Sequence, residues 1–204
     1  MRRSGGLRFA ALLLVACGDD GSDEGVHVRE TTEATTAPMT ADAIPVAHTP
    51  EGGWHGAMPA PVLADCTEPV VEGAPDLRGL WQVVEVEVGG EVVPNHPALR
   101  HVERVEQCGD RLVVTGGGVI HDMRVDGTEA NGVNDVAQAD FTTPITVVAA
   151  YEEGVHVLRP VGLPVEITRR REGAQMAWRY VGFTARLDRI GESTDPYPPA
   201  EEAP

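Results

Sequence analysis

The chain has 204 residues, enough for one globular domain with a tail but too few for two full domains. Its 32 acidic residues outnumber the 16 basic ones and give a formal net charge of −16. Because such a surface repels phosphate backbones, we expect no nucleic acid partner.

The N-terminus has the layout of an export signal. Arg2 and Arg3 precede the apolar run Phe9–Ala16, which ends directly before Cys17. The run is far shorter than the roughly 20 residues that span a bilayer as a helix. A positive start followed by a short apolar stretch is typical of a removable signal peptide, here residues 1–16.

The end of this signal resembles the lipobox of bacterial lipoproteins, because Leu14–Cys17 reads Leu-Val-Ala-Cys. The resemblance implies that Cys17 becomes the lipidated first residue of the mature chain, which is then extracytoplasmic. Gly18 stands where an inner-membrane retention signal would have Asp, so we expect a lipid anchor in the outer membrane, on its periplasmic or surface face. The alternative is an ordinary secretory signal that ends near Cys17.

Residues 17–65 are predicted to form a disordered tether. The stretch Gly18–Gly25 is acidic and Thr31–Pro38 has low complexity, and neither contains a helical or strand-like apolar period. A flexible coil of this length reaches about 40 Å, enough to hold a domain clear of a membrane. Trp54 and His55 are interpreted as incidental loop residues of this tether.

Two cysteines remain once Cys17 carries a lipid. Cys66 and Cys108 form an even pair in an oxidising compartment, which predicts a disulfide. Closing a loop of this length stabilises the fold by roughly 4 kcal/mol in the loop-entropy model. The alternative is a pair of free buried thiols.

Residues 66–190 are predicted to form an all-β domain. Val84, Val86 and Val88 alternate with acidic residues, as in a half-buried strand that ends at a Gly-Gly turn. Gly109-Asp110 predicts a tight hairpin between the strands on either side of it. The further strands are expected at 91–93, 101–107, 111–115, 119–125, 145–150, 155–158, 165–170 and 175–190, the last broken at Gly182.

About eight or nine short strands at roughly ten-residue spacing, with no helical window, indicate an antiparallel sandwich or barrel. The proline-rich and acidic residues 191–204 are predicted to be a disordered tail. The domain opens with Gly79-x-Trp81, which resembles the start of a lipocalin barrel. The resemblance implies a meander barrel with an Arg packed over Trp81, either Arg179 or Arg186. A small β-sandwich or an open barrel is the alternative, since the family's Thr-Asp-Tyr-like motif and C-terminal helix are missing.

No catalytic motif is found, and the mature chain has only Ser22 and Ser193 as serines, both in predicted disordered segments. We therefore expect no enzyme, no catalytic residues, no metal site and no cofactor. Candidate metal ligands in the β region are few and show no ligand spacing: His96, His101, His121, Asp122 and His156. The oxygen-rich segment 126–135 is interpreted as a solvated hairpin rather than a Ca²⁺ loop, and Arg169–Arg171 as a solvated turn.

Two functions follow from a lipid-anchored barrel. The first is binding of a small apolar ligand, with Trp81, Trp178 and Tyr180 as candidate ligand-binding residues. The alternative is a structural or protein-interaction lipoprotein whose barrel is filled by side chains. Aromatic residues make up only 4% of the chain, which favours a filled interior. The expected partners are the membrane and either a small apolar ligand or an envelope protein.

Overall fold

The computed structural model describes residues 39–198. The signal at 1–16, Cys17, the tether up to residue 38 and the tail from residue 199 lie outside the described residues. Within 39–198 there is one helical turn, η1 (Ala41–Ala43), and no helix there is long and apolar enough to cross a membrane.

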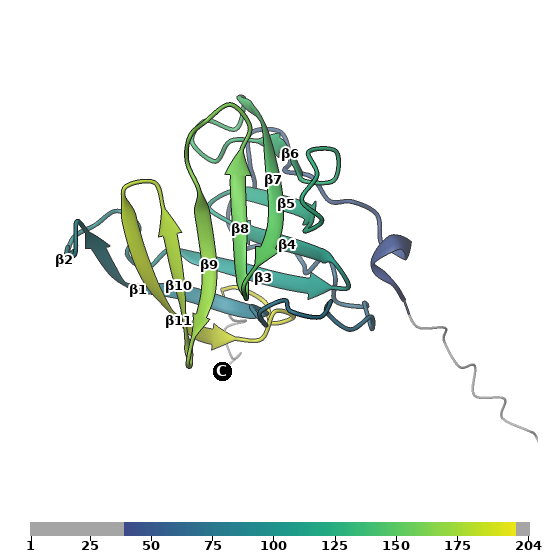
Figure 1. The fold of residues 1–204 in the computed structure, drawn as a ribbon, viewed down its shortest axis with the longest axis horizontal. Helices are drawn as coiled ribbons and strands as arrows, with labels where there is room; N and C mark the ends of the chain where they lie inside the picture. The colour runs from purple at the N-terminus through teal and green to yellow at the C-terminus, as the bar shows by residue number, and fades with distance from the viewer. Residues whose placement is uncertain (1–38, 199–204) are drawn as a thin grey trace, which may run out of the picture. The chain divides into compact units, whose positions relative to one another are not determined.

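The domain is an all-β antiparallel meander of 11 strands (Figure 1), which confirms the predicted fold class. The strands are β1 (Gly79–Val88), β2 (Glu91–Val92), β3 (Val102–Cys108), β4 (Arg111–Gly116), β5 (Val119–Arg124), β6 (Val133–Val136), β7 (Pro144–Glu152), β8 (Val155–Pro160), β9 (Ile167–Glu172), β10 (Gln175–Tyr180) and β11 (Phe183–Gly191).

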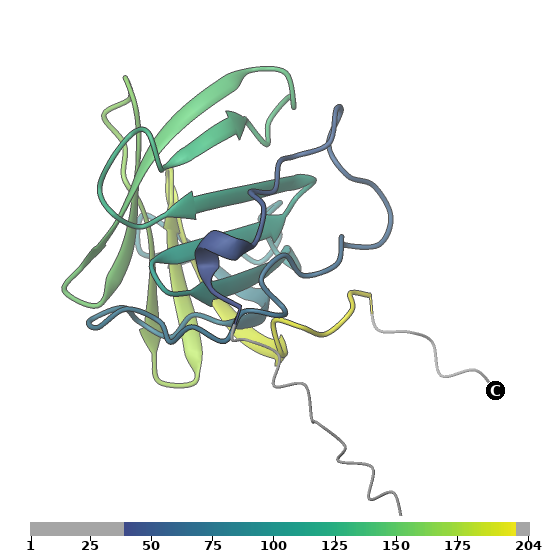
Figure 2. The ribbon, with the colours of Figure 1, turned by 90° about the vertical axis from the view of Figure 1, so that its right-hand side faces the viewer.

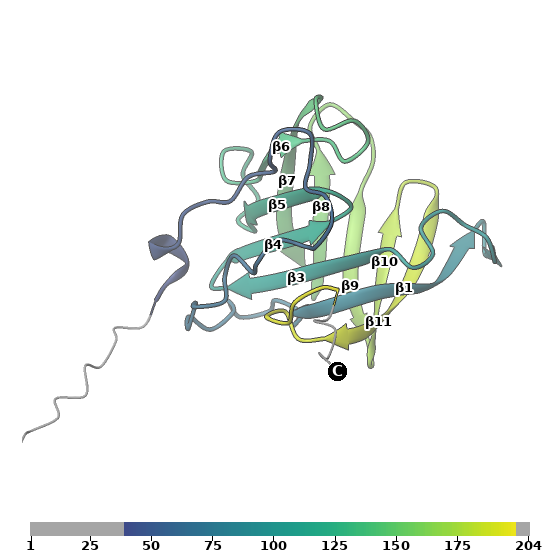
Figure 3. The ribbon, with the colours of Figure 1, turned by 180° about the vertical axis from the view of Figure 1, so that it is seen from behind.

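The strands curl into a nearly closed barrel (Figures 1 and 3). Their order is β5-β4-β3-β1-β11-β10-β9-β8-β7-β6, and β2 pairs with β1 alone. The two ends of this order approach each other, because the Arg124 amide donates to the Asn131 carbonyl over 2.7 Å. The His121 side chain likewise reaches the Val136 carbonyl over 3.1 Å. The architecture is compatible with a lipocalin-like barrel.

One strand was not expected from the sequence. The strand predicted at 91–93 is present as the two-residue β2, whereas β6 begins inside the segment 126–135 that was interpreted as a solvated hairpin. Val133 explains this strand, because it is 1% exposed and packs in the main core. One buried valine thus holds an otherwise polar segment against β7.

The alternation in β1 differs from the expectation because the strand contains a β-bulge. Val83 pairs with Leu187 and Glu85 with Arg186, which leaves Val84 as the extra residue. Val84 is 44% exposed and Val88 is 40% exposed, while Val86 is fully buried. The prediction that the three valines share one buried face is therefore wrong.

The barrel interior is packed with apolar side chains from most strands. Each buried aliphatic or aromatic side chain contributes about 1.5–3 kcal/mol relative to exposure. Trp81 is the largest of the fully buried side chains in this core. Other members that are at most 2% exposed are Leu77, Val83, Val86, Val105, Leu112, Met123, Val133, Ala149, Met176, Ala185 and Leu187.

The predicted hairpin at Gly109-Asp110 is confirmed. Cys108 of β3 pairs with Arg111 of β4, so the turn has two residues. Gly109 has a φ of 58°, a value that side-chain-bearing residues rarely adopt, which explains why glycine stands there. We call this end of the barrel the Gly109 end, and the opposite end, with the turn between β10 and β11, the Gly182 end.

Residues 39–65, assigned above to a disordered tether, instead form an ordered segment, which together with Cys66 we call the strap. Figure 2 shows the strap crossing the outer face of β3, β4 and β5. Ala41 and Leu63 are buried there against Val113 and Ile120 in a second apolar cluster. The strap contains too few large apolar residues to show this packing in its sequence.

Hydrogen bonds from charged side chains hold the strap in place. Arg111 donates to the Ala41, Ile44 and Pro45 carbonyls at 2.6–2.9 Å and forms a bidentate pair with Asp122. On β3, the Glu106 carboxylate accepts from the Val62 and Leu63 amides. The buried side chains of Arg111 and Glu106 thus have hydrogen-bond partners in the strap backbone. Each hydrogen bond to a charged group stabilises the fold by about 1.5–3 kcal/mol.

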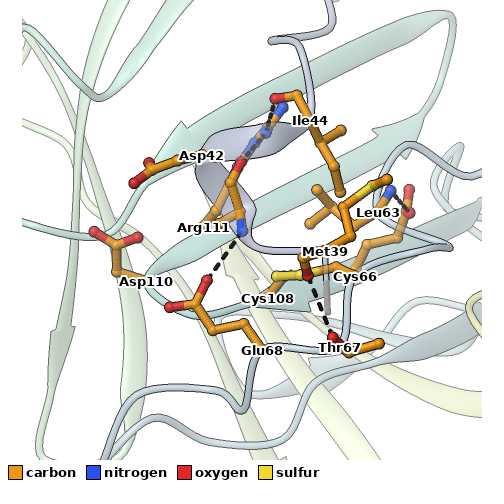
Figure 4. Close-up of a disulfide and its surroundings, with 12 residues drawn as sticks. Met39, Asp42, Ile44, Leu63, Cys66, Thr67, Glu68, Cys108, Asp110 and Arg111 are labelled. Atoms are coloured by element: carbon orange, nitrogen blue, oxygen red, sulfur yellow. Dashed lines mark hydrogen bonds between the residues drawn. A yellow bond between two sulfur atoms is a disulfide. The ribbon is translucent and has the colours of Figure 1, made fainter. Parts of the chain in front are cut away.

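The disulfide between Cys66 and Cys108 is present, which confirms the prediction (Figure 4). The two Cα atoms are 6.1 Å apart, within the usual range for a disulfide. The bond ties the end of the strap to β3, and the Met39 carbonyl accepts from the Thr67 amide beside it. The strap is therefore fixed at the Gly109 end.

The segment after β11 is also ordered as far as residue 198, unlike the predicted tail 191–204. Arg104 donates to the Asp195 carbonyl over 2.8 Å, and the Met58 amide donates to the Tyr197 carbonyl over 2.8 Å. Arg104 is buried between the strap and this segment. Its guanidinium joins the two ends of the described chain.

Candidate functional site

Four inward-facing side chains form a row across β7, β8, β9 and β10. Tyr151 pairs in register with His156, His156 with Arg169, and Arg169 with Trp178. Directly opposite residues on neighbouring strands point to the same face of a sheet, which here is the barrel interior. We call these four residues the inner polar row.

A buried ion pair crosses the interior to meet this row. Glu103 on β3 accepts from Nε and Nη2 of Arg169, both at 2.8 Å, and both side chains are at least 93% buried. Burial alone would raise the pKa of Glu103, but the charge and hydrogen bonds of Arg169 outweigh this effect and lower the pKa. The pair is therefore ionised at neutral pH and has no net charge.

Three members of the row have polar atoms without a hydrogen-bond partner in the protein. These atoms are Nη1 of Arg169, Nε1 of Trp178 and both ring nitrogens of His156. Leaving a buried polar group unpaired costs about 1–3 kcal/mol. The inner polar row therefore contains buried hydrogen-bonding atoms for which the protein supplies no partner.

His156 is electrically neutral in this position. Its side chain is fully buried, and burial together with the nearby charge of Arg169 lowers its pKa to about 3. The ring lies 6.0 Å from the ring of Tyr151, centroid to centroid. A neutral imidazole has one donor and one acceptor nitrogen, so His156 offers one of each.

Tyr151 begins the row and is linked to β3. Its hydroxyl accepts a hydrogen bond of 2.8 Å from Nε2 of Gln107, whose Oε1 accepts from the Leu77 amide. Burial raises the pKa of Tyr151 to about 12. The phenol is therefore protonated at neutral pH and keeps its own proton for donation.

Trp178 ends the row inside an aromatic cluster near the Gly182 end. Its ring centroid lies 5.5 Å from His101, 5.2 Å from Tyr180 and 5.5 Å from Phe183. The guanidinium of Arg169 lies 5.5 Å from the same ring. Burial is the main reason that the pKa of His101 is lowered, so this ring adds no charge to the cluster at neutral pH.

The three candidate ligand-binding residues are only partly brought together. Trp178 and Tyr180 are in contact, whereas Trp81 lies deeper, paired in register with Glu103. The indole of Trp81 donates to the Leu77 carbonyl over 2.7 Å. Its nitrogen is therefore already satisfied, unlike that of Trp178.

The Arg over Trp81 is neither of the two expected residues. The guanidinium of Arg171 lies 4.8 Å from the Trp81 ring centroid. Arg186 instead forms outer-face ion pairs with Glu85 and Glu172, and Arg179 lines a cleft on the same face. An arginine does lie over Trp81, but β9 supplies it rather than β10 or β11.

The segment Arg169–Arg171 is also not the solvated turn that was expected. Arg169 points inward to Glu103, Arg170 points outward to Glu172, and Arg171 covers Trp81. Strand alternation in β9 would have placed the first and third arginines on one face. The alternation could be read from the sequence, but the neighbouring residues do not indicate which face of the strand is buried.

The candidate metal ligands do not converge. Within residues 39–198, the one group of three close metal-binding side chains is Cys66, Glu68 and Cys108, and its two cysteines are consumed by the disulfide. Asp122 faces the strap and pairs with Arg111. In the segment 126–135, the Asp126 carboxylate accepts from Thr128 and Asn131 and is satisfied locally.

Three clefts open on the outside of the barrel. One of about 380 Å³ lies between the strap and the β5–β6 seam, beside Asp135. A second, of about 580 Å³, lies at the Gly182 end beside Tyr180 and Phe183, and a third, of about 1160 Å³, lies over the outer face of β7 to β11. All three are lined in part by charged side chains, unlike the inner polar row with its apolar surroundings.

Comparison with protein-family models and with curated proteins finds no match to this chain.

Proposed function

We propose that this protein is a lipoprotein of the cell envelope whose lipocalin-like barrel binds a small, mainly apolar ligand. Cys17 would carry the lipid and hold the protein at the outer membrane, on its periplasmic or surface face. The proposal rests on the resemblance of Leu14–Cys17 to a lipobox and on the disulfide between Cys66 and Cys108, which suits an oxidising compartment.

The observation that carries ligand binding is the set of unpaired donors on Arg169, His156 and Trp178 inside an apolar barrel. Ligand sites in proteins are mostly apolar with a few placed polar groups that fix orientation. The aromatic cluster of Trp178, Tyr180 and Phe183 lies beside these donors and supplies the apolar surface.

The test is native mass spectrometry of the lipidated protein, released from detergent micelles after incubation with a small-molecule extract of the producing cells. A ligand-binding barrel should carry an added, defined mass that disappears when the protein is unfolded before injection. The mass of the lipidated chain alone, in both samples, would contradict ligand binding.

A second candidate, a protein-interaction lipoprotein with a filled barrel, is favoured by a different observation. Exposed apolar side chains gather on three hairpins of the Gly182 end, including Val92, Leu163 and Val181. Single exposed apolar residues are normal, whereas a group of them marks interaction surfaces. This candidate predicts that the protein recovers an envelope protein by crosslinking at Leu163 while the barrel binds no small molecule.

A further inference from the structure

Exposed apolar side chains gather at the Gly182 end of the barrel. Residues 39–198 contain 11 exposed large apolar side chains, and six of them lie at three hairpin tips of this end. The six are Val88 and Val92 around the β1–β2 turn, Val161 and Leu163 between β8 and β9, and Tyr180 and Val181 at the β10–β11 turn. Three of them, Val92, Leu163 and Val181, are more than half exposed.

The three hairpin tips are neighbours, because they surround one cleft of about 580 Å³. Each tip contributes two residues to its lining: Gly89, Gly90, Pro164, Val165, Val181 and Gly182. A group of exposed apolar residues, unlike scattered single ones, marks an interaction surface. Since each tip belongs to a different hairpin, this surface consists of separate apolar points with a hollow between them, rather than one flat patch.

Two unpaired arginines lie at the same end. Of the 12 arginines in residues 39–198, Arg100 and Arg179 are the two whose guanidinium has neither an ion pair nor a hydrogen bond there. Arg100 lies in the loop that leads into β3 from this end, and Arg179 of β10 lines the cleft between the tips. Both side chains are exposed and free to bind a partner.

The acidic residues around the cleft leave these two charges uncompensated. Glu87 pairs with Arg186 at 3.7 Å, and Glu166 pairs with Arg159 at 2.8 Å. Glu91 of β2 is exposed and has no ion pair within the described part of the chain. The Gly182 end thus offers two free cations and one free anion.

We propose that the Gly182 end docks on the surface of a zwitterionic phospholipid bilayer. The aliphatic side chains of the three tips insert among the headgroups, Arg100 and Arg179 bind lipid phosphates, and Glu91 faces a headgroup ammonium group. Apolar side chains combined with arginines hold amphipathic segments in this interfacial layer. Tyr180 belongs to a residue type that is enriched there.

Charge and shape select this partner. The net charge of −16 repels a strongly anionic surface, whereas zwitterionic headgroups offer both signs of charge without a net charge. A fluid bilayer also adapts to three separate tips, while a protein partner would need a projection that fills the hollow between them. Docking of this kind does not depend on ligand binding by the barrel, so it goes beyond the proposed function.

The test places a new indole either at a tip or at the opposite end. Leu163→Trp changes an exposed tip residue, and Val71→Trp is the matched control, because Val71 is exposed and its amide donates to the Gly109 carbonyl at the other end. Each full-chain protein is reconstituted with phosphatidylcholine vesicles, either plain or brominated in the acyl chains. Bromine quenches tryptophan fluorescence on contact, so only an indole inserted in the bilayer loses emission. Any lipid on Cys17 is common to both variants.

Brominated lipid should remove most of the added emission of Leu163→Trp and leave that of Val71→Trp unchanged. Combining Leu163→Trp with Arg179→Gln should weaken the quenching, whereas Arg78→Gln should not, because Arg78 is already paired with Asp76. Replacing part of the phosphatidylcholine by phosphatidylglycerol should not strengthen the quenching. Urea denaturation at the wild-type midpoint reports that each variant is folded.

Equal quenching of the two tryptophan variants, or none of Leu163→Trp, would overturn membrane docking. Crosslinking of Leu163 to an envelope protein would then assign the tips to the protein-interaction candidate, and a dimer abolished by Leu163→Ser would assign them to a second copy. Stronger quenching with phosphatidylglycerol, or an unaffected Arg179→Gln variant, would overturn the zwitterionic headgroup site. None of these results changes the outcome of native mass spectrometry, which tests ligand binding separately.

Discussion

Several charged side chains are buried in this protein, in addition to its apolar core. Glu103 and Arg169 are both buried in the interior, and Arg104 and Arg111 are buried under the strap. Each has its charge paired or its hydrogen bonds supplied by backbone carbonyls, apart from single nitrogens of Arg104 and Arg169. Such groups stabilise little by themselves, but removing one partner leaves the other uncompensated.

Arg169→Met should therefore destabilise the protein strongly. The substitution leaves the Glu103 carboxylate buried without a partner, and we expect the free energy of unfolding to fall by about 3–5 kcal/mol. The free energy of unfolding is measured by urea denaturation, monitored through tryptophan fluorescence. Arg170→Met is the matched control, because Arg170 is exposed and its ion pair with Glu172 should be worth less than about 1 kcal/mol. Equal losses in the two variants would contradict the role given to the buried pair.

His156 should make the fold sensitive to acid. Below its ordinary pKa of about 6.5 the unfolded chain binds a proton on this residue, whereas the folded protein does so only near pH 3. The unfolded state thus binds more protons between these values, so stability falls as the pH is lowered through this window. For this residue alone the loss between pH 7 and pH 5 is about 2 kcal/mol.

The measurement compares urea denaturation at pH 7 and pH 5 for the wild type and for His156→Leu. The variant should lose less stability than the wild type between the two pH values. If both proteins lose the same amount, His156 is not buried in its neutral form.

At the scale of elements, the strap buries part of the outer face of the barrel and forms a second apolar cluster with it. Its apolar residues cover β3, β4 and β5, while Arg111 and Glu106 bind its backbone. Most of these bonds join residues more than 40 positions apart in sequence. The segment is therefore stable only when the barrel has formed beneath it.

The disulfide should contribute substantially to holding this arrangement. Cys66 and Cys108 are separated by 42 positions, and closing such a loop corresponds to about 4 kcal/mol in the loop-entropy model. The double variant Cys66→Ser/Cys108→Ser should unfold at correspondingly lower urea concentration than the oxidised wild type. The control is the wild type under reducing conditions, which should match the variant. A thiol reagent that labels both cysteines in denatured, unreduced protein would disprove the bond in solution.

At the scale of the whole molecule, the described part of the chain begins at the Gly109 end of the barrel. Met39 pairs with Cys66 there, next to the disulfide. The aromatic cluster and the exposed apolar hairpins lie at the opposite, Gly182 end.

Lipidation at Cys17 remains a prediction of the sequence. Cells supplied with radiolabelled palmitate should label the wild type and should not label Cys17→Ser. The Cys66→Ser/Cys108→Ser variant serves as the control, since it lacks two other cysteines and should still be labelled. Equal labelling of wild type and Cys17→Ser would show that the lipobox resemblance is misleading.

The all-β meander and the pairing of Cys66 with Cys108 could be predicted from the sequence alone. Alternating β-branched residues and Gly-containing turns are local signals, and a two-residue hairpin at Gly109-Asp110 needs only neighbouring residues to be recognised. If Cys17 carries a lipid as the sequence predicts, Cys66 and Cys108 are the only two cysteines left to pair. Trp178 and Tyr180 are in contact, and their role in ligand binding stays a prediction.

Only the tertiary structure decided which way the polar residues face. Glu103 and Arg169 are 66 positions apart, and their pairing exists because β3 and β9 face each other across the barrel. The bulge at Val84 reverses the expected face of a valine, and the strap is ordered by hydrogen bonds rather than by its own apolar content. The physical reason is the same in each case: an exposed and a buried arginine, or a free and a docked loop, have the same local sequence and differ only in the partners that distant segments bring to them.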